Sequence, residues 1–415
     1  MSRILQIASM VLLAGAMVGV QAQTATSDAP VAIQTRIYQE GNKWVEEVTG
    51  TLTTSKGFKL MTDVGRIEIE GAAQSNITYV VRKRAYKASE QEARRILAAF
   101  QVRASRTAEA ATLLGGWDEE YSHKKLDAEF VVRVPRELQW VKAATEAGGV
   151  TVRNINGKVY AMTGSGGIQL DAINGPVAAE TAGGGIVVGW LGSDATLQTA
   201  GGGVSVKSVK GKLVVETGGG GIAIGTAAGP VSVSTQGGGI AVEECGGPLA
   251  AETQGGGITI GSVNGSVVLS TQGGSIHLNG AKGRVQASTM GGGMKLLNLV
   301  YGVNAETMAG SILAEFVGGR DTFTASSLQT SQGDVIVYLP AGLGVNVEAD
   351  IDVAQGHTIS ATDFPELRIT SEGGTYGPKQ IYAVGAIQGG GPLLKLHTTS
   401  GSIVIQRGKK TEAKK

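Results

Sequence analysis

Hydrophobic and polar positions alternate through the middle of the chain, and the alternation repeats every eighteen residues. Each repeat has a threonine, a glycine-rich corner, and then an aliphatic residue or methionine five positions after the threonine. Because residues two apart on a strand share a face, the pattern predicts two short strands per repeat, with apolar side chains on one side. The repeat threonines are Thr145, Thr163, Thr181, Thr199, Thr217, Thr235, Thr253, Thr271, Thr289 and Thr307.

A two-strand repeat of this size cannot bury its apolar face alone, so the repeats must stack. The sequence therefore predicts an all-β fold, a β-solenoid in which each eighteen-residue coil contributes two strands. We expect glycine at the corner because the backbone there needs a positive φ angle and approaches the next coil closely. With parallel strands about 4.8 Å apart, the ten coils make a rod roughly 45 Å long.

A solenoid needs less regular segments to cover its terminal coils, and such a segment precedes the repeats. It combines strand-like runs with one helix over residues 89–100, where Ser89 and Glu92 form a capping box. Within it, Thr62 and Ile67 fit the repeat, which places one coil ahead of a long insertion. We therefore predict an N-terminal cap of α+β character.

Two further copies of the repeat, at Thr330 and Thr398, frame a second insertion over residues 340–397. This insertion predicts a C-terminal β cap, and the lysine-rich end of the chain is typical of a disordered charged tail. The predicted parts are a signal peptide (1–22), an N-terminal capping domain (23–140), the β-solenoid repeats (141–338), the C-terminal β cap (339–408) and the tail (409–415).

The first 22 residues have the parts of a secretory signal. Arg3 gives a basic start, residues 4–20 form an apolar run, and Ala22 ends a small-residue cleavage site. We expect cleavage after Ala22 and export to the periplasm, the cell surface or the medium. The alternative is an uncleaved membrane anchor, since about 17 apolar residues are at the lower limit for a spanning helix.

Charge and cysteine content exclude two further features. The net charge of +1 gives no electrostatic basis for binding nucleic acid. Cys245 is the only cysteine, so no intrachain disulfide can form. Its place in an apolar column predicts a buried core residue rather than a reactive thiol.

The sequence predicts no metal site and no cofactor. A calcium ladder would need an aspartate at every corner, but Asp171 and Asp194 are the only aspartates between residues 145 and 320. The glycine runs lack the lysine and the following helix of a phosphate-binding loop. The four histidines fit no zinc spacing; they are His123, His277, His357 and His397.

Glycan hydrolysis is the main enzymatic alternative, because it uses paired carboxylates. Glu180, Glu216 and Glu252 lie in one outward column on every second coil, about 10 Å apart, which is just beyond the separation for inverting hydrolysis. The same spacing avoids stacking like charges on neighbouring coils, and we favour this interpretation and expect no enzyme. Amides that could hydrogen-bond along the stack follow the threonine on three coils, at Gln236, Gln254 and Gln272.

A cluster of basic residues lies in the N-terminal segment and could hold an anionic partner, such as an envelope polymer or lipid headgroups. The alternative, which we favour, is a solvated face whose acidic partners lie elsewhere in the fold. The six residues of this basic cluster are Arg82, Lys83, Arg84, Lys87, Arg94 and Arg95.

Motifs outside the regular repeats follow a definite order. A coil-like start leads to a strand ending in Val134-Pro135, then to T-x-x-G-x-I/V repeats, to Q-G-D-V-x-V-x-L-P at 332–340 and to T-S-G-S-I-V-I at 399–405. This order resembles the bacterial putative-adhesin family of exported β-strand-repeat proteins. The resemblance implies a binding module that presents an extended surface at the cell envelope, with no catalytic residues to assign. Self-assembly into a structural scaffold remains an alternative.

Overall fold

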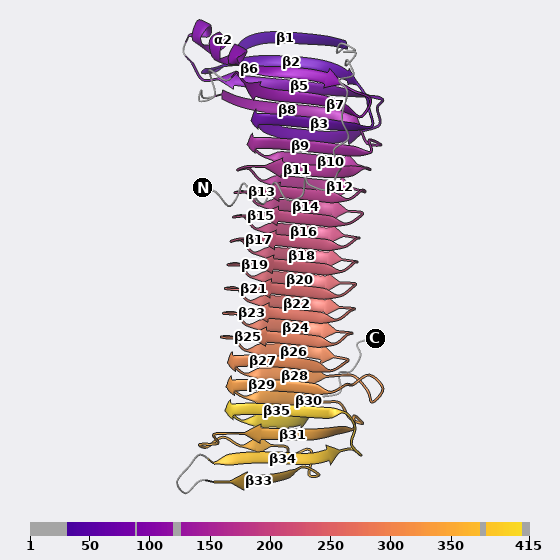
Figure 1. The fold of residues 1–415 in the computed structure, drawn as a ribbon, viewed down its shortest axis with the longest axis vertical. Coiled ribbons are helices and arrows are strands. Elements are labelled where there is room, and N and C mark those ends of the chain that lie inside the picture. The colour runs from indigo at the N-terminus through magenta and orange to yellow at the C-terminus, as the bar shows by residue number, and fades with distance from the viewer. Residues whose placement is uncertain (1–30, 88, 119–125, 374–378, 409–415) are drawn as a thin grey trace, which may run out of the picture.

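The computed structural model describes residues 31–87, 89–118, 126–373 and 379–408. The strands cross the long axis of a rod and stack along it, with β1 and α2 at one end and β33 at the other (Figure 1). The predicted signal peptide and the charged tail lie outside the described residues. Within the described ranges, no helix combines the length and the apolar character needed to cross a membrane.

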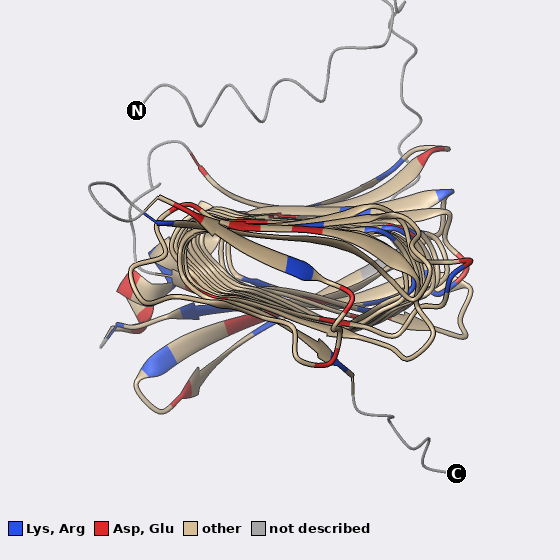
Figure 2. Ribbon diagram, turned by 90° about the horizontal axis from the view of Figure 1, so that it is seen from below, with Lys and Arg blue, Asp and Glu red and all other residues tan. Residues whose placement is uncertain are grey.

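Two sheets form the rod and face each other across a flattened interior (Figure 2). In order of pairing, the first sheet contains β1 (Val31–Glu40), β2 (Lys43–Thr53), β5 (Asn76–Ala85), β8 (Leu126–Pro135), β4 (Arg66–Ala72), β10 (Val150–Ile155), β12 (Ile168–Ile173), β14 (Ile186–Leu191), β16 (Val204–Val209), β18 (Ile222–Ala227), β20 (Ile240–Cys245), β22 (Ile258–Val263), β24 (Ile276–Ala281), β26 (Met294–Leu299), β28 (Ile312–Phe316), β30 (Val335–Leu339), β36 (Ile403–Arg407) and β32 (Ile359–Ser360).

The second sheet lies opposite the first and carries all the repeat threonines. In order of pairing, it contains β6 (Phe100–Arg106), β7 (Ala110–Trp117), β3 (Gly57–Val64), β9 (Trp140–Ala147), β11 (Lys158–Thr163), β13 (Val177–Thr181), β15 (Ala195–Thr199), β17 (Leu213–Thr217), β19 (Val231–Thr235), β21 (Leu249–Thr253), β23 (Val267–Thr271), β25 (Val285–Thr289), β27 (Val303–Ala309), β29 (Ser326–Gln332), β35 (Leu393–Ser400), β31 (Val345–Ile351), β34 (Gln380–Ile387) and β33 (Arg368–Glu372).

Strands of neighbouring coils are parallel and pair in register. On the second sheet, Thr163 lies opposite Thr181, which in turn lies opposite Thr199. Because the register is kept, each inward column stacks on itself, and the aliphatic side chains of all the coils form one continuous buried core. The predicted all-β solenoid with two strands per coil is confirmed.

The repeat threonines are buried because their hydroxyl groups join neighbouring coils. The Thr217 hydroxyl donates to the carbonyl oxygen of Gly202, at 2.7 Å, and accepts from the N–H of Gly220, at 3.2 Å. The same two bonds recur in the coils from Thr163 to Thr289. A buried hydroxyl that both donates and accepts costs little, so the column fixes the corner without loss of stability.

Close approach between coils explains the middle glycine of each corner. A Cβ atom placed on Gly220 would overlap the carbonyl group of Gly202 in the preceding coil. The positive φ angle that we predict for every corner is wrong for the regular coils. It occurs in the coils beside the two insertions, at Gly65, Gly148, Gly310 and Gly333. In the regular coils the corner therefore excludes larger residues through space rather than through backbone conformation.

The N-terminal insertion extends both sheets beyond the first coil. Thr62 of β3 lies opposite Thr145 of β9, so one coil precedes the insertion, as predicted. The helix α2 (Glu90–Ala99) packs against β2, β5 and β6 and buries Ile96 and Leu97. The hydroxyl of its N-cap residue Ser89 accepts from the N–H of Glu92 at 3.4 Å, which matches the predicted cap.

The C-terminal insertion is likewise framed by two coils. Thr330 of β29 lies opposite both Thr307 and Thr398, so β35 resumes the repeat after the insertion, as predicted. Beyond β35 the second sheet continues through β31, β34 and β33. The strand β33 is the last of this sheet, and all five of its residues are exposed.

Candidate binding groove

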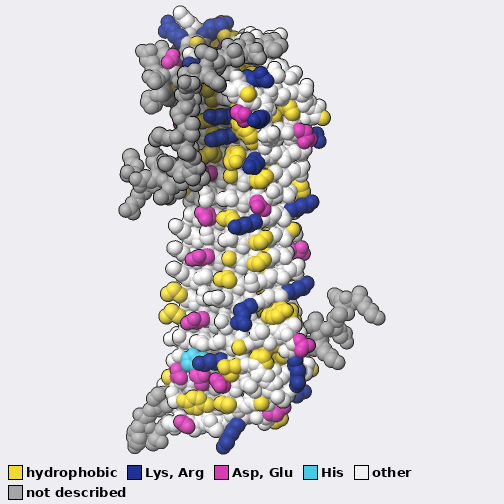
Figure 3. Space-filling view, turned by 45° about the vertical axis from the view of Figure 1, so that its right-hand side comes forward, with side chains coloured by type: hydrophobic (Ala, Val, Ile, Leu, Met, Phe, Trp, Pro, Cys, Tyr) yellow, Lys and Arg dark blue, Asp and Glu magenta, His cyan; other side chains and the backbone are white. Residues whose placement is uncertain are grey.

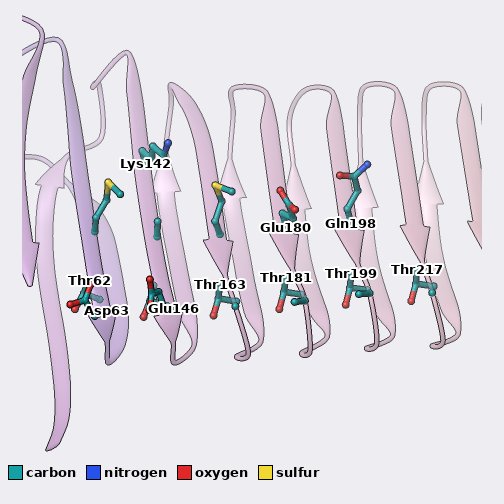
Figure 4. A pocket seen from close by; sticks show the side chains of 18 of the residues that line it. Thr62, Asp63, Lys142, Glu146, Thr163, Glu180, Thr181, Gln198, Thr199 and Thr217 are labelled. Atoms are coloured by element: carbon teal, nitrogen blue, oxygen red, sulfur yellow. The ribbon is translucent and has the colours of Figure 1, made fainter. Parts of the chain in front are cut away.

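A groove of about 1180 Å³ runs along the outer face of the second sheet, from β6 in the N-terminal cap to β21 and its following corner. Its floor consists of the side chains that come directly before and after the repeat threonines. These positions alternate with buried ones, and the register is kept, so they form straight rows along the rod. In Figure 4, Glu180 and Gln198 project from neighbouring strands beside the row of threonines.

The N-terminal end of the groove combines an apolar row with the charged residues Asp63, Arg103, Lys142 and Glu146. Leu114, Met61 and Met162 lie in one row, joined through Ala144, and the three large side chains are 36–39% exposed. Trp117 and other residues of β6 and β7 line the same end. This end could not be predicted from the sequence, because β6 and β7 belong to the insertion and do not carry the repeat pattern.

The middle of the groove is acidic. Glu180, Glu216 and Glu252 are all exposed and line the groove, as their outward column predicts. Gln198 donates to the carboxylate of Glu216 at 3.1 Å, and none of the three glutamates has an ion pair among the described residues. In Figure 3, acidic side chains recur down the middle of the rod, and basic side chains lie on the same view of it. Within the groove, the two cations of the lining, Arg103 and Lys142, belong to β6 and β9 at the N-terminal end, so this stretch carries negative charge that is not paired within the described residues.

Exposed amides border the acidic stretch. Gln236 and Gln254 line the groove, and Gln272 continues their row on the next coil. The predicted hydrogen bonds between these side chains are not found: in the described part of the chain, none of the three amide groups is bonded to another. Each amide therefore has donors and an acceptor free for solvent or for a ligand.

The basic cluster is largely paired with acidic residues of neighbouring strands. Arg82 bonds to Glu47 at 2.9 Å, and Arg84 bonds to Glu129 at 2.6 Å. On and beside α2, the ion pairs are Lys87 with Glu92 at 2.8 Å and Arg94 with Glu90 at 2.7 Å. Arg95 is exposed on the same helix. These pairs leave α2 as the part of the cluster that a partner can reach.

Ion pairing also shifts the ionisation of the acidic partners. Burial alone would raise the pKa of Glu47, but the hydrogen bond from Arg82 and the charge of Arg36 hold it below its ordinary value. The hydrogen bond from Arg84 lowers the pKa of Glu129. Both carboxylates therefore support the N-terminal cap in their charged form.

Lys83 has a structural role within the cap. Its side chain is buried, pairs with Glu46 at 2.5 Å, and donates to the carbonyl oxygens of Leu97 and Phe100 at 2.7 and 3.0 Å. These carbonyls belong to the C-terminal end of α2, where the last turn leaves acceptors without partners in the helix. Lys83 thus caps the helix from β5 and is not exposed to an anionic partner.

Three residues that sequence spacing did not connect meet near the C-terminal end. His397 of β35 lies opposite Asp350 of β31; its Nδ1 contacts the Asp350 carboxylate, and its Nε2 is 3.8 Å from Asp352. One imidazole and two carboxylates could hold a divalent metal ion. The insertion separates these residues along the chain, so a search for short zinc-ligand spacings could not find them.

The other histidines lie apart from this cluster. His277 is exposed on β24, as its outward column predicts. His357 is 3.5 Å from the Ser400 hydroxyl. The remaining one, His123, lies outside the described residues.

The predicted core cysteine is confirmed. Cys245 is buried, and its thiol donates to the carbonyl oxygen of Gly247 at 3.2 Å. Burial raises the pKa of the thiol, which keeps it protonated and unreactive. The two aspartates between residues 145 and 320 accept backbone N–H bonds: Asp171 from Trp190 at 3.0 Å and Asp194 from Lys212 at 2.8 Å.

Comparison with known proteins gives no family assignment. No protein family model matches the chain, and no curated protein matches it. Two solved structures match over most of their length. A putative cell adhesion protein from Clostridium sporogenes is 11% identical; the match covers 92% of this chain and 100% of that chain, with a TM-score of 0.15. A putative adhesin from Bacteroides fragilis is 12% identical; the match covers 87% of this chain and 97% of that chain, with a TM-score of 0.19. Both TM-scores are too low to carry an argument about function.

Proposed function

We propose that this protein is an exported, non-catalytic binding module that presents one long side of its rod to a partner at the cell envelope or surface. The groove on the second sheet is the observation that carries the proposal, because it offers a continuous row of polar side chains over five coils, from Glu180 to Glu252. A concave surface of this length suits an extended partner better than a compact one. The sequence features of a signal peptide and the resemblance to exported adhesins support the compartment.

The absence of a catalytic role is part of the proposal. The candidate carboxylates Glu180, Glu216 and Glu252 are exposed to solvent on alternate coils, separated by Gln198 and Ser234. Hydrolysis requires a carboxylic acid whose pKa is raised by its surroundings, beside a second carboxylate at a fixed separation. Their exposed positions match the charge-spacing interpretation better.

Co-sedimentation of residues 23–415 with envelopes from the source cells tests the proposal. We expect saturable binding that the variant E180Q/E216Q/E252Q weakens. The variant R94Q/R95Q tests the basic cluster instead. If this variant loses binding while E180Q/E216Q/E252Q keeps it, and if high salt also abolishes binding, then the partner is anionic and binds at α2. Absence of binding at every salt concentration would contradict an envelope-binding function.

Self-assembly into a scaffold is the second candidate, and one observation favours it. The terminal strand β33 exposes all five residues, including the apolar Ile369, and among the described strands it pairs only with β34. An open edge strand is a template for pairing with another chain. Rods joined at this end would form a longer structural element.

A further inference from the structure

We propose that the groove binds an extended, cationic polypeptide in the polyproline II conformation. This inference rests on the proposed function, because it names the class of partner for the same groove. The charge of the groove favours a cationic partner. Between the coils of Thr181 and Thr253, the outward positions of the second sheet hold no lysine or arginine, while Glu180, Glu216 and Glu252 are exposed without ion pairs. The negative potential of this stretch attracts a cationic partner.

The spacing of the glutamates along the rod favours the polyproline II conformation. The three glutamates occupy every second coil, so their rows recur about every 9.6 Å, twice the separation of parallel strands. A polyproline II helix advances about 3.1 Å per residue with three residues per turn, which repeats a side chain every 9.3 Å or so. A cationic residue at every third position would therefore stay within about 0.6 Å of register across all three glutamates.

A peptide in the β conformation fits this spacing less well. It places side chains of one face about 6.8 Å apart, so its second cation would already lie nearly 3 Å from the next glutamate. Avoidance of like-charge repulsion explains why the glutamates skip a coil. It does not explain why cations are missing from the rows around them, whereas a site for a cationic ligand does.

The groove also offers hydrogen-bond donors for the backbone of such a ligand. A polyproline II helix has no internal hydrogen bonds, so its carbonyl oxygens need donors from outside. Gln236 and Gln254 line the groove with amide groups that bond to no other described residue, at a spacing of one coil. These amides can donate to ligand carbonyls in the way that polar groups assist other polyproline grooves.

The apolar row at the N-terminal end of the groove gives the ligand a direction. Leu114, Met61 and Met162 form an exposed row, and Trp117 lines the same end. Proline rings and other apolar residues pack well on such side chains. We therefore expect the proline-rich or apolar end of the partner at the N-terminal cap and its cations over the solenoid.

The test uses the full mature chain, residues 23–415, and fluorescent peptides. One probe is a repeated Lys-Pro-Pro peptide of about eighteen residues, and the control peptide has the same composition with its lysines consecutive. Fluorescence anisotropy at low salt should show tighter binding of the regularly spaced peptide. The variant E180Q/E216Q/E252Q should weaken that binding about ten- to thirtyfold, because each exposed charge pair contributes a few-fold.

A matched variant controls for net charge. E243Q/E244Q/E366Q removes as many exposed carboxylates outside the groove and should bind the spaced peptide like the unaltered protein. Equal binding of the two peptides, or undiminished binding by the groove variant, would overturn the proposal. The proposal would also be overturned if the groove bound a linear β-1,4-linked N-acetylglucosamine hexamer and neither peptide. That result would assign the groove to a glycan. Envelope co-sedimentation that persists in either case would leave the broader binding function standing.

Discussion

At the residue scale, the buried threonine determines the corner of each coil. Threonine supplies a hydroxyl that donates to the preceding coil and accepts from its own coil, and the side chain is buried. Valine has the same shape but neither hydrogen-bonding function. The recurrence of threonine in the sequence thus reflects hydrogen bonding that a pattern of apolar positions does not reveal.

Thr199→Val isolates this hydroxyl. The substitution leaves the carbonyl of Gly184 and the N–H of Gly202 without their partner in a tight corner, so we expect a loss of about 1–3 kcal/mol in the free energy of unfolding. Thr196→Val, at an exposed position of the same strand, is the control and should change stability little. Urea unfolding followed by circular dichroism measures both, and equal midpoints for the two variants would contradict the role of the hydroxyl.

Neighbouring glycines of one corner should differ sharply in tolerance. A Cβ on Gly292 would overlap the carbonyl of Gly274, whereas the nearest atom to a Cβ on Gly291 is 3.5 Å away. We expect Gly292→Ala to lower stability by about 1–3 kcal/mol and Gly291→Ala to be tolerated. Thermal unfolding of the pair of variants gives the measurement. A loss at Gly291 as large as that at Gly292 would show that backbone conformation, not space, selects glycine.

At the element scale, α2 depends on a lysine from β5. Lys83→Met would remove the donor to the Leu97 and Phe100 carbonyls and leave Glu46 without its partner. We expect a loss of about 3 kcal/mol in the stability of the N-terminal cap. Arg95→Met, on the exposed side of the helix, should cost less than about 0.5 kcal/mol. Hydrogen exchange of α2 distinguishes the two, and comparable protection in both variants would contradict the capping role.

The stability of the N-terminal cap should depend on pH through its paired carboxylates. The pKa of Glu47 is lower in the folded chain than its ordinary value of 4.5, so the unfolded state binds more protons in acid. Its contribution is complete above that value and is lost as the pH falls through the folded pKa. The stability difference between the unaltered protein and Glu47→Gln should therefore shrink below pH 4.5 or so. Urea titrations from neutral to acid pH measure this difference, and a difference that stays constant would contradict the role of Glu47.

Regular elements could be predicted from the sequence, while the irregular ones could be predicted only in part. The coils of Thr62, Thr330 and Thr398 were recognisable because each keeps the spacing of threonine and aliphatic residues. The acidic row of the groove followed from the same periodicity. Its N-terminal end did not, because Leu114 and Trp117 reach the groove only through the pairing of β7 with β3, which no local pattern encodes. The same limit applies to His397 and Asp350, whose contact depends on a long-range pairing.

At the scale of the whole molecule, each end of the rod presents a terminal strand. The first sheet ends at β1 and the second at β33, which is exposed along its whole length. If rods associate through this end, sedimentation velocity will show concentration-dependent assembly, and Ile369→Lys will abolish it by placing a charge on the edge. Exposed Val268, on the side of the solenoid, gives the matched control Val268→Lys, which should assemble normally. Monomers at all concentrations would leave binding along the side as the remaining function.

The in-register stacking also makes the length of the rod independent of its ends. Every regular coil has eighteen residues and the same kind of corner. Each coil therefore packs against an equivalent neighbour at any position in the rod. Gain or loss of one whole unit by gene duplication or deletion would change the reach of the molecule by about 4.8 Å and leave both caps untouched. The span of the rod can therefore change in fixed increments without a redesign of the fold.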